Sequence, residues 1–370
     1  MMPDLRYRGR FAFRILAVVA ATALLACRPD PADRPPVIEA YNLRVESARL
    51  GDRLHIFIWP DYLDPELVEE FERTYGVRVV IDYYDNNEAL IAKLKAGGIG
   101  QYDLAVASDY AVEVLKEQNL LQPLDTTTLP NLVNLDPRFR SLPFGAENRY
   151  SVAYQWGTSG LGVRTDRVRD PDRVLASWKL VFDPAHALGP FAMLNDPRET
   201  IGAALLYLGY SANSTDEREL AEERLLLAQR PRVLTYAPFA TARDLLASGD
   251  VVVSHNYSGD VLMAQAEVPA IRYLIPQEGA IVWTDNLVIP AGAPHRYTAE
   301  VFINFLLDAR IGARLSNFTR YATPNAAALP FVDPELRADR AVYPDSALLD
   351  RLEFLRDVGP ARVVYDRIWT

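Results

Sequence analysis

Residues 54–84 read LHIFIWPDYLDPELVEEFERTYGVRVVIDYY and contain the pattern that decides the fold. Residues 54–58 are mostly apolar, which predicts a buried strand. Asp64 is a typical cap residue, proline follows it at the first helical position, and Gly76 ends the amphipathic run that comes next. Residues 77–84 are rich in β-branched and aromatic side chains, which predicts a second strand. A strand, a helix and another strand in this order indicate an α/β unit.

The same alternation continues along the rest of the 370 residues. Apolar runs predict strands at 103–107, 191–194, 251–254, 271–275 and 287–290. Helical periodicity predicts helices at 87–96, 197–208 and 299–307 and over most of 346–370. The chain is 49% hydrophobic and long enough for two domains. We therefore expect an α/β fold with largely parallel sheets, its second region beginning near residue 150.

The N-terminal segment has the features of a secretory signal. Four arginines between residues 6 and 14 precede an apolar run at 15–26, which is too short for a comfortable membrane span. The run ends in Leu-Leu-Ala-Cys, and Cys27 is the single cysteine of the sequence. This ending is similar to the bacterial lipobox, whose cysteine is acylated and becomes the mature N-terminus. A cysteine placed there by coincidence is the alternative.

These features predict how the protein is located and attached. We expect residues 1–26 to be a lipoprotein signal peptide, and Cys27 to carry the lipid of a membrane-anchored lipoprotein in the periplasm or at the cell surface. Residues 28–36 are rich in proline, so we expect residues 27–52 to comprise the lipidated cysteine and a tether. With one cysteine, the folded part has no disulfide of its own.

The charge of the chain limits its partners. The formal net charge is −10, and it becomes −13 once residues 1–26 are removed, because they hold four arginines and one aspartate. Such an acidic protein repels phosphates, so we expect no nucleic-acid partner. A small cationic ligand is compatible with this charge, although many acidic proteins are acidic for solubility alone.

Signatures of enzymes are scarce. The sequence has no Walker loop, no Gly-x-Gly-x-x-Gly motif after a strand and no His-Glu-x-x-His motif. Its four histidines do not have the spacing of a zinc site. The glycine-rich residues 157–162 lack the Gly-x-Ser-x-Gly spacing of a nucleophile elbow, and we expect them to form a tight strand connection. We therefore expect no catalytic residue, no cofactor and no metal.

Aromatic and acidic residues recur together near the expected strand ends, where ligands bind in open α/β sheets. They are Trp59, Asp61, Tyr62, Ser108, Asp109, Tyr110, Asp196, Glu199, Tyr257, Trp283 and Asp285. Structural alternatives exist for several of them. Asp196 and Glu199 have the spacing of a helix capping box, Ser108 suits an N-cap, and Trp283 alone suits a core. The recurrence of acids beside rings is what favours a binding site.

This combination of residues fits one ligand chemistry well. An aliphatic diamine needs carboxylates at its ammonium ends, because a buried charge without a partner is costly. Its methylene chain needs flat apolar walls, which aromatic faces supply together with a cation–π attraction of about 0.5–2 kcal/mol each. A sugar site would contain more Asn, Gln and Arg beside the rings.

Several motifs, in order, resemble the polyamine-binding proteins of ABC importers, the spermidine and putrescine receptors. The resemblance covers about residues 54–359 and is carried by IWPDYLDPELVEEFERTYGVRVV, AKLKAGGIGQYDLAVASDY, LGYS, EGAIVWTDNLVIP and YATPN. It implies a two-lobed periplasmic binding protein fold of type II, with two α/β lobes, a hinge and the ligand cleft between them. The implied lobes are 53–156 plus 285–329 and 157–284 plus 330–370, with YSVAYQWG and WTDNLVIP as crossing strands.

The resemblance also implies roles for individual residues. The aromatic box of the family falls on Trp59, Tyr62, Tyr110, Tyr257, Trp283 and Tyr321. The acids of the family fall on Asp196, Glu199 and Asp285, with Asp285 as the main partner of a buried ammonium, and on Asp61 at the mouth. Ser108 matches a hydroxyl that contacts the ligand.

Three positions depart from the family pattern. Tyr257 stands where a Trp is usual, and Pro60 replaces a Ser or Thr, which removes a hydroxyl contact. Leu355 occupies a position where the spermidine receptor carries an amine-binding Gln, which argues mildly against spermidine bound in the usual way. These departures leave the choice of polyamine open.

The resemblance implies a monomeric substrate-binding lipoprotein that captures a putrescine-like or spermidine-like polyamine and delivers it to an ABC permease. One alternative is a polyamine sensor that signals through a protein partner without transport. Another is the same fold binding a different small ligand, such as a ferric ion or thiamine. A secreted hydrolase is disfavoured by the missing nucleophile and metal patterns.

Overall fold

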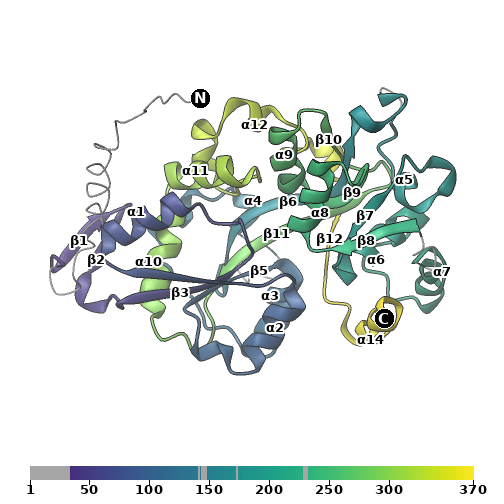
Figure 1. Cartoon of the computed structure of the whole chain (residues 1–370). Helices are drawn as coiled ribbons and strands as arrows, with labels where there is room; N and C mark the ends of the chain where they lie inside the picture. Colours follow the sequence, from purple (N-terminus) through teal and green to yellow (C-terminus); the bar gives the residue numbers. More distant parts are fainter. Residues whose placement is uncertain (1–33, 141, 143–147, 172–173, 228–231) are drawn as a thin grey trace, which may run out of the picture.

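The computed structural model describes residues 34–370 except 141, 143–147, 172–173 and 228–231. The expected signal peptide, Cys27 and the first part of the expected tether therefore lie outside the described residues. The described chain forms two α/β halves that are joined by long strands (Figure 1). No helix in the described ranges combines the length and the apolar character that crossing a membrane requires.

The strands are β1 (Val37–Ala40), β2 (Leu43–Glu46), β3 (Arg53–Ile58), β4 (Arg78–Tyr83), β5 (Leu104–Ser108), β6 (Ser151–Arg164), β7 (Phe191–Leu194), β8 (Val233–Ala237), β9 (Val253–Tyr257), β10 (Ile271–Leu274), β11 (Ala280–Val288) and β12 (Leu352–Phe354). The helices are α1 (Pro65–Tyr75), α2 (Asn87–Lys95), α3 (Asp109–Glu117), α4 (Pro137–Arg140), α5 (Lys179–Phe182), α6 (Pro197–Leu208), α7 (Glu217–Leu227), α8 (Phe239–Ser248), α9 (Ser258–Glu267), α10 (Arg296–Leu306), α11 (Ala309–Thr319), α12 (Pro334–Ala338), α13 (Ser346–Leu349) and α14 (Arg362–Trp369).

The stretch that predicted the fold forms the expected β3–α1–β4 unit. The Asp64 carboxylate accepts a hydrogen bond from the Glu66 amide at 2.9 Å, and Gly76 ends α1 with a φ of 65°. The apolar face of α1 is fixed by Phe71, which is fully buried and packs edge-on against Phe302 of α10 with ring centroids 4.8 Å apart. β3 pairs in parallel with β4 and with β5, as the strand–helix alternation predicts.

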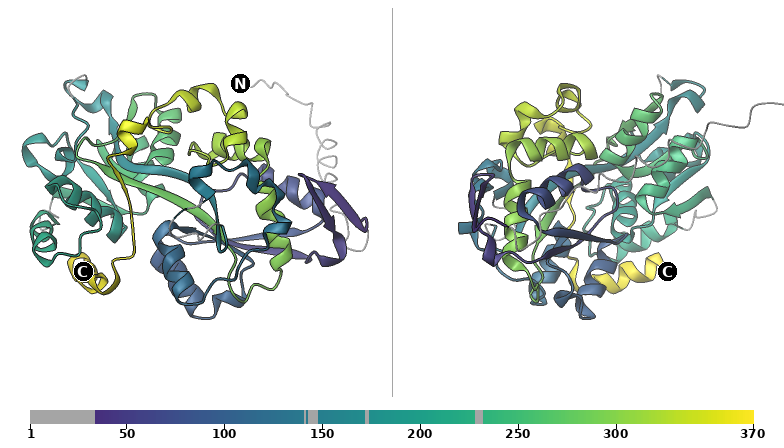
Figure 2. Two further views of the ribbon diagram at one scale, coloured as in Figure 1. Left: turned by 180° about the vertical axis from the view of Figure 1, so that it is seen from behind. Right: turned by 60° about the vertical axis from the view of Figure 1, so that its left-hand side comes forward.

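Within the described residues, ten strands form one sheet with the order β4-β3-β5-β11-β6-β9-β7-β8, while β10 pairs with β6 and β12 with β11. β6 and β11 are its central strands and belong to both halves. Residues 151–155 of β6 pair with 285–288 of β11, which in turn pair with β5. Residues 159–163 of β6 pair instead with β9 in the other half. Figure 2 shows from behind how these strands pass from one half to the other.

The two halves have the same arrangement of parallel strands and helices. β3, β4 and β5 are parallel to one another, and so are β7, β8 and β9. In each half, the chain leaves the carboxyl end of a strand directly into a helix: β5 into α3, β7 into α6, β8 into α8 and β9 into α9. Side chains at these strand ends are therefore placed along one edge of each half.

The glycine-rich residues 157–162 are not a strand connection, contrary to the expectation, because they lie inside β6. A Cβ atom on Gly157 would lie 2.7 Å from Cζ2 of Trp283, and one on Gly160 would lie 2.5 Å from the carbonyl oxygen of Leu274. Both distances are too short for a real contact. The glycines are thus explained by the close approach of neighbouring strands and not by a turn.

Further expectations about elements differ from the structure. The sheet is mixed and not largely parallel, because β6 and β11 pair antiparallel with each other, with β9 and with β5. The strand expected at 251–254 is β9, which starts two residues later, because the amide of Val252 bonds to the Pro190 carbonyl before the ladder begins. The expectation of a mostly helical 346–370 fails at β12, which pairs in parallel with residues 280–282 of β11. So short a strand forms only by docking on β11, and no local periodicity indicates it.

The expected tether is folded over its second part. β1 and β2 form an antiparallel hairpin whose two turn residues, Tyr41 and Asn42, have φ values of 49° and 58°. The Tyr41 ring packs edge-on against Phe305 at 4.8 Å, and the amide of Asn42 donates to Asn131 at 2.9 Å. Residues 37–46 are therefore attached to the body of the protein.

Candidate ligand-binding site

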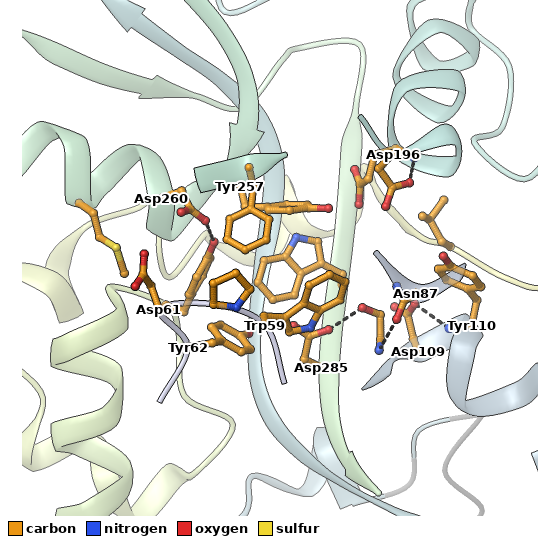
Figure 3. Close-up of a pocket in the computed structure, with 18 residues that line it drawn as sticks. Trp59, Asp61, Tyr62, Asn87, Asp109, Tyr110, Asp196, Tyr257, Asp260 and Asp285 are labelled. Carbon is orange, nitrogen blue, oxygen red and sulfur yellow. Dashed lines mark hydrogen bonds between the residues drawn. The ribbon is translucent and has the colours of Figure 1, made fainter. Parts of the chain in front are cut away.

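A pocket lies where the strand ends of the two halves meet, and it encloses about 610 Å³ of space free of protein atoms, part of it open to solvent (Figure 3). All eleven residues expected from the sequence line this one pocket: Trp59, Asp61, Tyr62, Ser108, Tyr110, Asp196, Glu199, Tyr257, Trp283, Asp285 and Tyr321. Residues that are more than 250 positions apart in the chain are thus brought together.

The sequence reasoning assigned no ligand contact to five residues that also line the pocket: Asn87, Asp109, Phe239, Asp260 and Met263. Asp109 is among the acids noted near strand ends in the sequence, and Asp260 lies at the start of α9, so the same rule could have found it. Phe239 and Met263 carry no such signal, because an apolar residue on a helix is read as core. The other two departures from the family pattern, Pro60 and Leu355, line the pocket as well as Tyr257.

The walls of the pocket are aromatic rings packed edge to face. Trp283 on β11 contacts Tyr257 with ring centroids 5.6 Å apart and Tyr321 with centroids 5.1 Å apart. Tyr321 in turn lies 5.5 Å from Tyr62, at an interplanar angle of 82°. On the other side Trp59 packs on Tyr84 at 4.3 Å. These contacts fix the rings without a ligand, so the apolar walls are already formed.

Asp285 lies in the middle of this wall. The register of β11 against β6 shifts between Asp285 and Asn286, which leaves one extra residue on β6. Such bulges redirect side chains and are frequent beside functional sites. The Ser108 hydroxyl donates to Oδ1 of Asp285 at 2.6 Å, so Ser108 does not cap α3 with its side chain. Burial nevertheless raises the pKa of Asp285 to about 6, and the Ser108 and Tyr62 hydroxyls act to lower it.

A second group of carboxylates lies at one end of the pocket, where Figure 3 shows Asp109, Asp196 and Tyr110. Asp196 accepts hydrogen bonds from the amides of Arg198 at 2.9 Å and Glu199 at 3.1 Å, so it is the helix cap that the sequence allowed. Burial, followed by the charge of Glu88, raises the pKa of Asp196 to about 7. Capping and lining the pocket are therefore compatible in one residue.

Two carboxylates at this end have an oxygen without a protein partner. Oε2 of Glu199 and Oδ2 of Asp109 are buried and make no hydrogen bond to the described residues. Burial is also the largest cause that raises the pKa of each group, and for Glu199 the neighbouring charge of Asp196 adds to it. Buried acceptors without partners are costly, and a donor supplied by a ligand would satisfy them.

The opposite end of the pocket holds Asp61 and Asp260 (Figure 3). Asp61 is the more exposed of the two, with 56% of its side chain accessible, and it has a φ of 54°. Asp260 is buried, and its Oδ2 accepts the hydroxyl of Tyr321 at 2.5 Å. Acids thus lie at both ends and in the middle of an aromatic channel.

The arrangement favours an elongated cation. Carboxylates can neutralise ammonium groups at the ends, and the rings can cover an aliphatic chain between them. Within the described residues, no cluster of three or more His, Cys, Asp or Glu side chains has the geometry to hold a metal ion.

The model of the bacterial extracellular solute-binding protein family matches residues 66–344. The chain belongs to this family. Together with the structural likeness described below, this shows that its two halves are the lobes of a type II periplasmic binding protein fold, as the sequence predicted.

Three relatives illustrate the likeness. The spermidine/putrescine-binding periplasmic protein of Salmonella typhimurium is 33% identical over 331 residues, which cover 89% of this chain and 94% of the relative. The putrescine/cadaverine-binding protein of Pseudomonas aeruginosa is 34% identical over 335 residues, covering 88% and 94%. A solved structure assigned to a spermidine/putrescine ABC transporter of Listeria monocytogenes has a TM-score of 0.81 at 36% identity and covers 86% of this chain and 98% of its own.

Proposed function

We propose that the protein captures a polyamine and delivers it to the permease of an ABC importer. The observation that carries the proposal is the pocket itself, in which buried carboxylates, two of them with an unpartnered oxygen, flank aromatic rings packed edge to face. Relatives whose names state spermidine, putrescine or cadaverine binding support it, because the match extends over nearly the whole chain.

In this proposal, each group of pocket residues contacts a different part of the ligand. Asp285 receives one ammonium group at the centre, because its carboxylate has only hydroxyl donors around it. Glu199 and Asp109 receive a second ammonium with their unpartnered oxygens. Trp283 and Tyr257 cover the methylene chain and exclude water, which strengthens the ion pairs. The proposed function is binding and delivery of the ligand, without a catalytic step.

The proposal extends to the lobes and the hinge. We assign lobe 1 to residues 53–156 plus 285–329 and lobe 2 to 157–284 plus 330–370. This division is supported by β6 and β11, each of which pairs with strands of both halves. Opening at these strands would release the ligand, and closing would transfer the ammonium groups from water to the carboxylates.

We further propose that the protein acts as a monomeric lipoprotein that is held to a membrane through Cys27. Support comes from the lipobox-like ending of the N-terminal apolar run and from the periplasmic location of the named relatives. The acidic net charge supports the absence of a nucleic-acid partner.

Titration calorimetry tests the function directly. The purified protein, refolded to remove carried-over ligand, is titrated with putrescine, cadaverine, spermidine and spermine, and with butylamine as a control that has a single ammonium group. We expect a dissociation constant of about 1 μM or less for at least one polyamine, and binding of butylamine about a hundredfold weaker. A folded protein that binds none of the four contradicts the proposal.

Transport is tested separately from binding. Deletion of the gene is expected to abolish uptake of the bound polyamine in the source organism, and a plasmid copy restores it. Normal uptake in the deletion strain, together with a changed transcriptional response to polyamine, would favour sensing over transport.

A further inference from the structure

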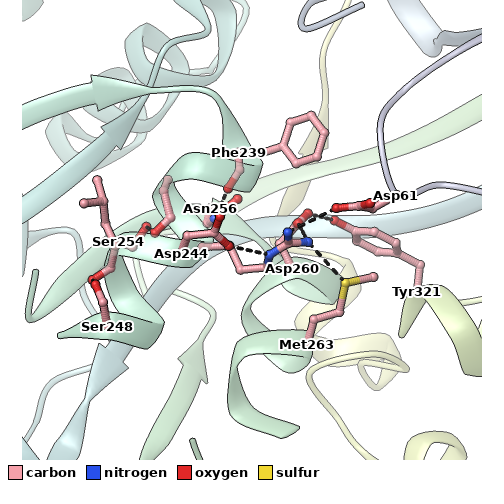
Figure 4. A network of polar contacts seen from close by, with 12 residues as sticks. Asp61, Phe239, Asp244, Ser248, Ser254, Asn256, Asp260, Met263 and Tyr321 are labelled. Carbon is pink, nitrogen blue, oxygen red and sulfur yellow. Dashed lines mark hydrogen bonds and ion pairs between the residues drawn. The ribbon is translucent and has the colours of Figure 1, made fainter. Parts of the chain in front are cut away.

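An arginine of the protein lies beside one end of the pocket, against Asp61, Asp260 and Met263 of its lining. Arg243 lies on α8, and only 18% of its side chain is exposed. Its Nη2 lies 3.1 Å from Oδ2 of Asp61, and its Nη1 lies 3.5 Å from Oδ1 of Asp260. Figure 4 shows Asp61, Asp260, Met263 and Tyr321 gathered in this network. The guanidinium therefore joins the loop after β3 to two helices of the opposite half.

The network leaves little room for another cation. Oδ1 of Asp260 faces Arg243 while Oδ2 accepts the hydroxyl of Tyr321, so both oxygens are engaged. Nη1 of Arg243 also lies 3.5 Å from the sulfur of Met263. The free oxygen is Oδ1 of Asp61, on a side chain that is 56% exposed, where an ion pair is weak because water screens it.

In the middle and at the opposite end of the pocket, by contrast, carboxylate oxygens are available to a ligand. Glu199 and Asp109 each keep a buried oxygen without a partner, and the contact of Asp285 is with a hydroxyl group. The nearest arginine there, Arg198, directs its Nη1 to the carbonyl of Arg356 at 2.8 Å and its Nη2 to Asn213 at 3.0 Å. Its charge acts on Asp196 and Glu199, but its donors do not use the unpartnered oxygens.

We propose that Arg243 serves as a built-in cation that fills the third ammonium position, so that the pocket selects diamines over the triamine spermidine. This inference rests on the proposed function and specifies its ligand. A diamine places its two ammonium groups on Asp285 and on the Glu199 end. A third ammonium would have to extend toward Asp61, where it meets the guanidinium of Arg243 as a like charge.

The inference agrees with an independent feature of the chain. Leu355 lines the pocket and is 5% exposed, so an apolar group stands where an amine-binding side chain would help a longer ligand. A buried ammonium beside Leu355 would gain no hydrogen bond from it. Both features lower the number of ammonium groups that the pocket can hold.

Competition between putrescine and spermidine tests the inference. Wild-type protein is expected to bind putrescine at least tenfold more tightly than spermidine in titration calorimetry. Arg243→Gln is expected to reduce the preference for putrescine over spermidine at least tenfold. The main cause is tighter binding of spermidine, because the carboxylates of Asp61 and Asp260 become available to its third ammonium group. Arg243→Lys keeps the charge and is expected to retain most of the preference. Arg272→Gln, at the exposed position of β10, removes an arginine outside the pocket lining and is expected to leave both affinities unchanged.

Each outcome decides the matter. A wild-type protein that binds spermidine as tightly as putrescine overturns the inference but leaves the proposed function intact. An unchanged ratio in Arg243→Gln, in a variant with the thermal unfolding of the wild type, also overturns it. If no polyamine binds the wild type, the proposed function fails and the inference fails with it.

Discussion

At the scale of the residue, the surroundings of Asp285 suit the binding role that we propose for it. It lies at the bulge between β6 and β11, next to the hydroxyl groups of Ser108 and Tyr62. Burial raises its pKa to about 6, and a cation held against it would lower that pKa again. The free energy released by restoring the charged state in contact with a cation contributes to affinity.

We predict that Asp285→Asn weakens binding of the preferred polyamine by about tenfold or more, because the substitution removes a charge but keeps the shape of the side chain. Titration calorimetry measures the change. Asp52→Asn is a control, since Asp52 is 62% exposed and lies outside the pocket lining. Equal affinity of Asp285→Asn and wild type would show that Asp285 is not part of the site.

The pocket acids also predict opposite effects of pH on stability and on binding. Burial raises the pKa of Asp285 and Asp260 to about 6 and that of Asp196 to about 7, above the usual value of 3.8. The folded, ligand-free protein therefore holds more protons than the unfolded chain between about pH 4 and 7, and its unfolding free energy falls as pH rises through this window. For these groups, stability is greatest at low pH.

We accordingly predict a higher melting temperature of the ligand-free protein at pH 5 than at pH 8, measured by calorimetry. Binding requires the ionised acids, so affinity for the polyamine is expected to fall by about tenfold or more between pH 8 and pH 5. Affinity that does not change over this range would show that the acids do not ionise on binding.

At the scale of elements, the glycines of β6 allow neighbouring strands and helices to pack close to its backbone. Its glycines lie where atoms of β10, β11, α8 and α9 would collide with a Cβ, and Gly157 faces the Trp283 ring and the Ser258 hydroxyl. The hinge strand thus positions the aromatic wall by its lack of side chains.

We predict that Gly157→Ala displaces Trp283 and weakens polyamine binding by about tenfold or more, because the new Cβ would lie 2.7 Å from the ring. Gly100→Ala is the matched control, since a Cβ there meets nothing within 4 Å. Calorimetric affinity and the melting temperature of both variants separate loss of the site from loss of the fold. Wild-type affinity in Gly157→Ala would contradict this role of β6.

Elements with strong local signals could be predicted from the sequence, and those formed by docking could not. α1 and α6 have a cap residue, proline and a terminal glycine, and the structure gives them the expected bounds. β12 has three residues and exists because β11 lies beside it. The glycines of β6 resemble a turn in sequence, since what they accommodate comes from residues more than 80 positions away.

At the scale of the molecule, the site exists because one sheet continues through both lobes. The pocket collects residues from the ends of strands in each lobe, and β6 and β11 connect them. Strand-end position identified the acids and rings in the sequence. It did not reveal Arg243, because its pairing with Asp61 and Asp260 depends on how α8 and α9 lie against the loop after β3.

We predict that the preferred polyamine, at about a thousand times its dissociation constant, stabilises the folded protein by about 4 kcal/mol. Differential scanning fluorimetry should show a rise in melting temperature of several degrees, and a smaller rise for Asp285→Asn at the same concentration. An unchanged melting temperature for the wild type would mean that the ligand does not bind across the two lobes.

The central claim, that a polyamine lies between the rings with its ammonium groups on the buried acids, is tested most directly by a crystal structure of the protein with putrescine. We expect one nitrogen within about 3.2 Å of the Asp285 carboxylate and the other at the Glu199 end, with the methylene chain against Trp283. Putrescine bound outside this pocket, or within it but without a carboxylate contact, would contradict the account.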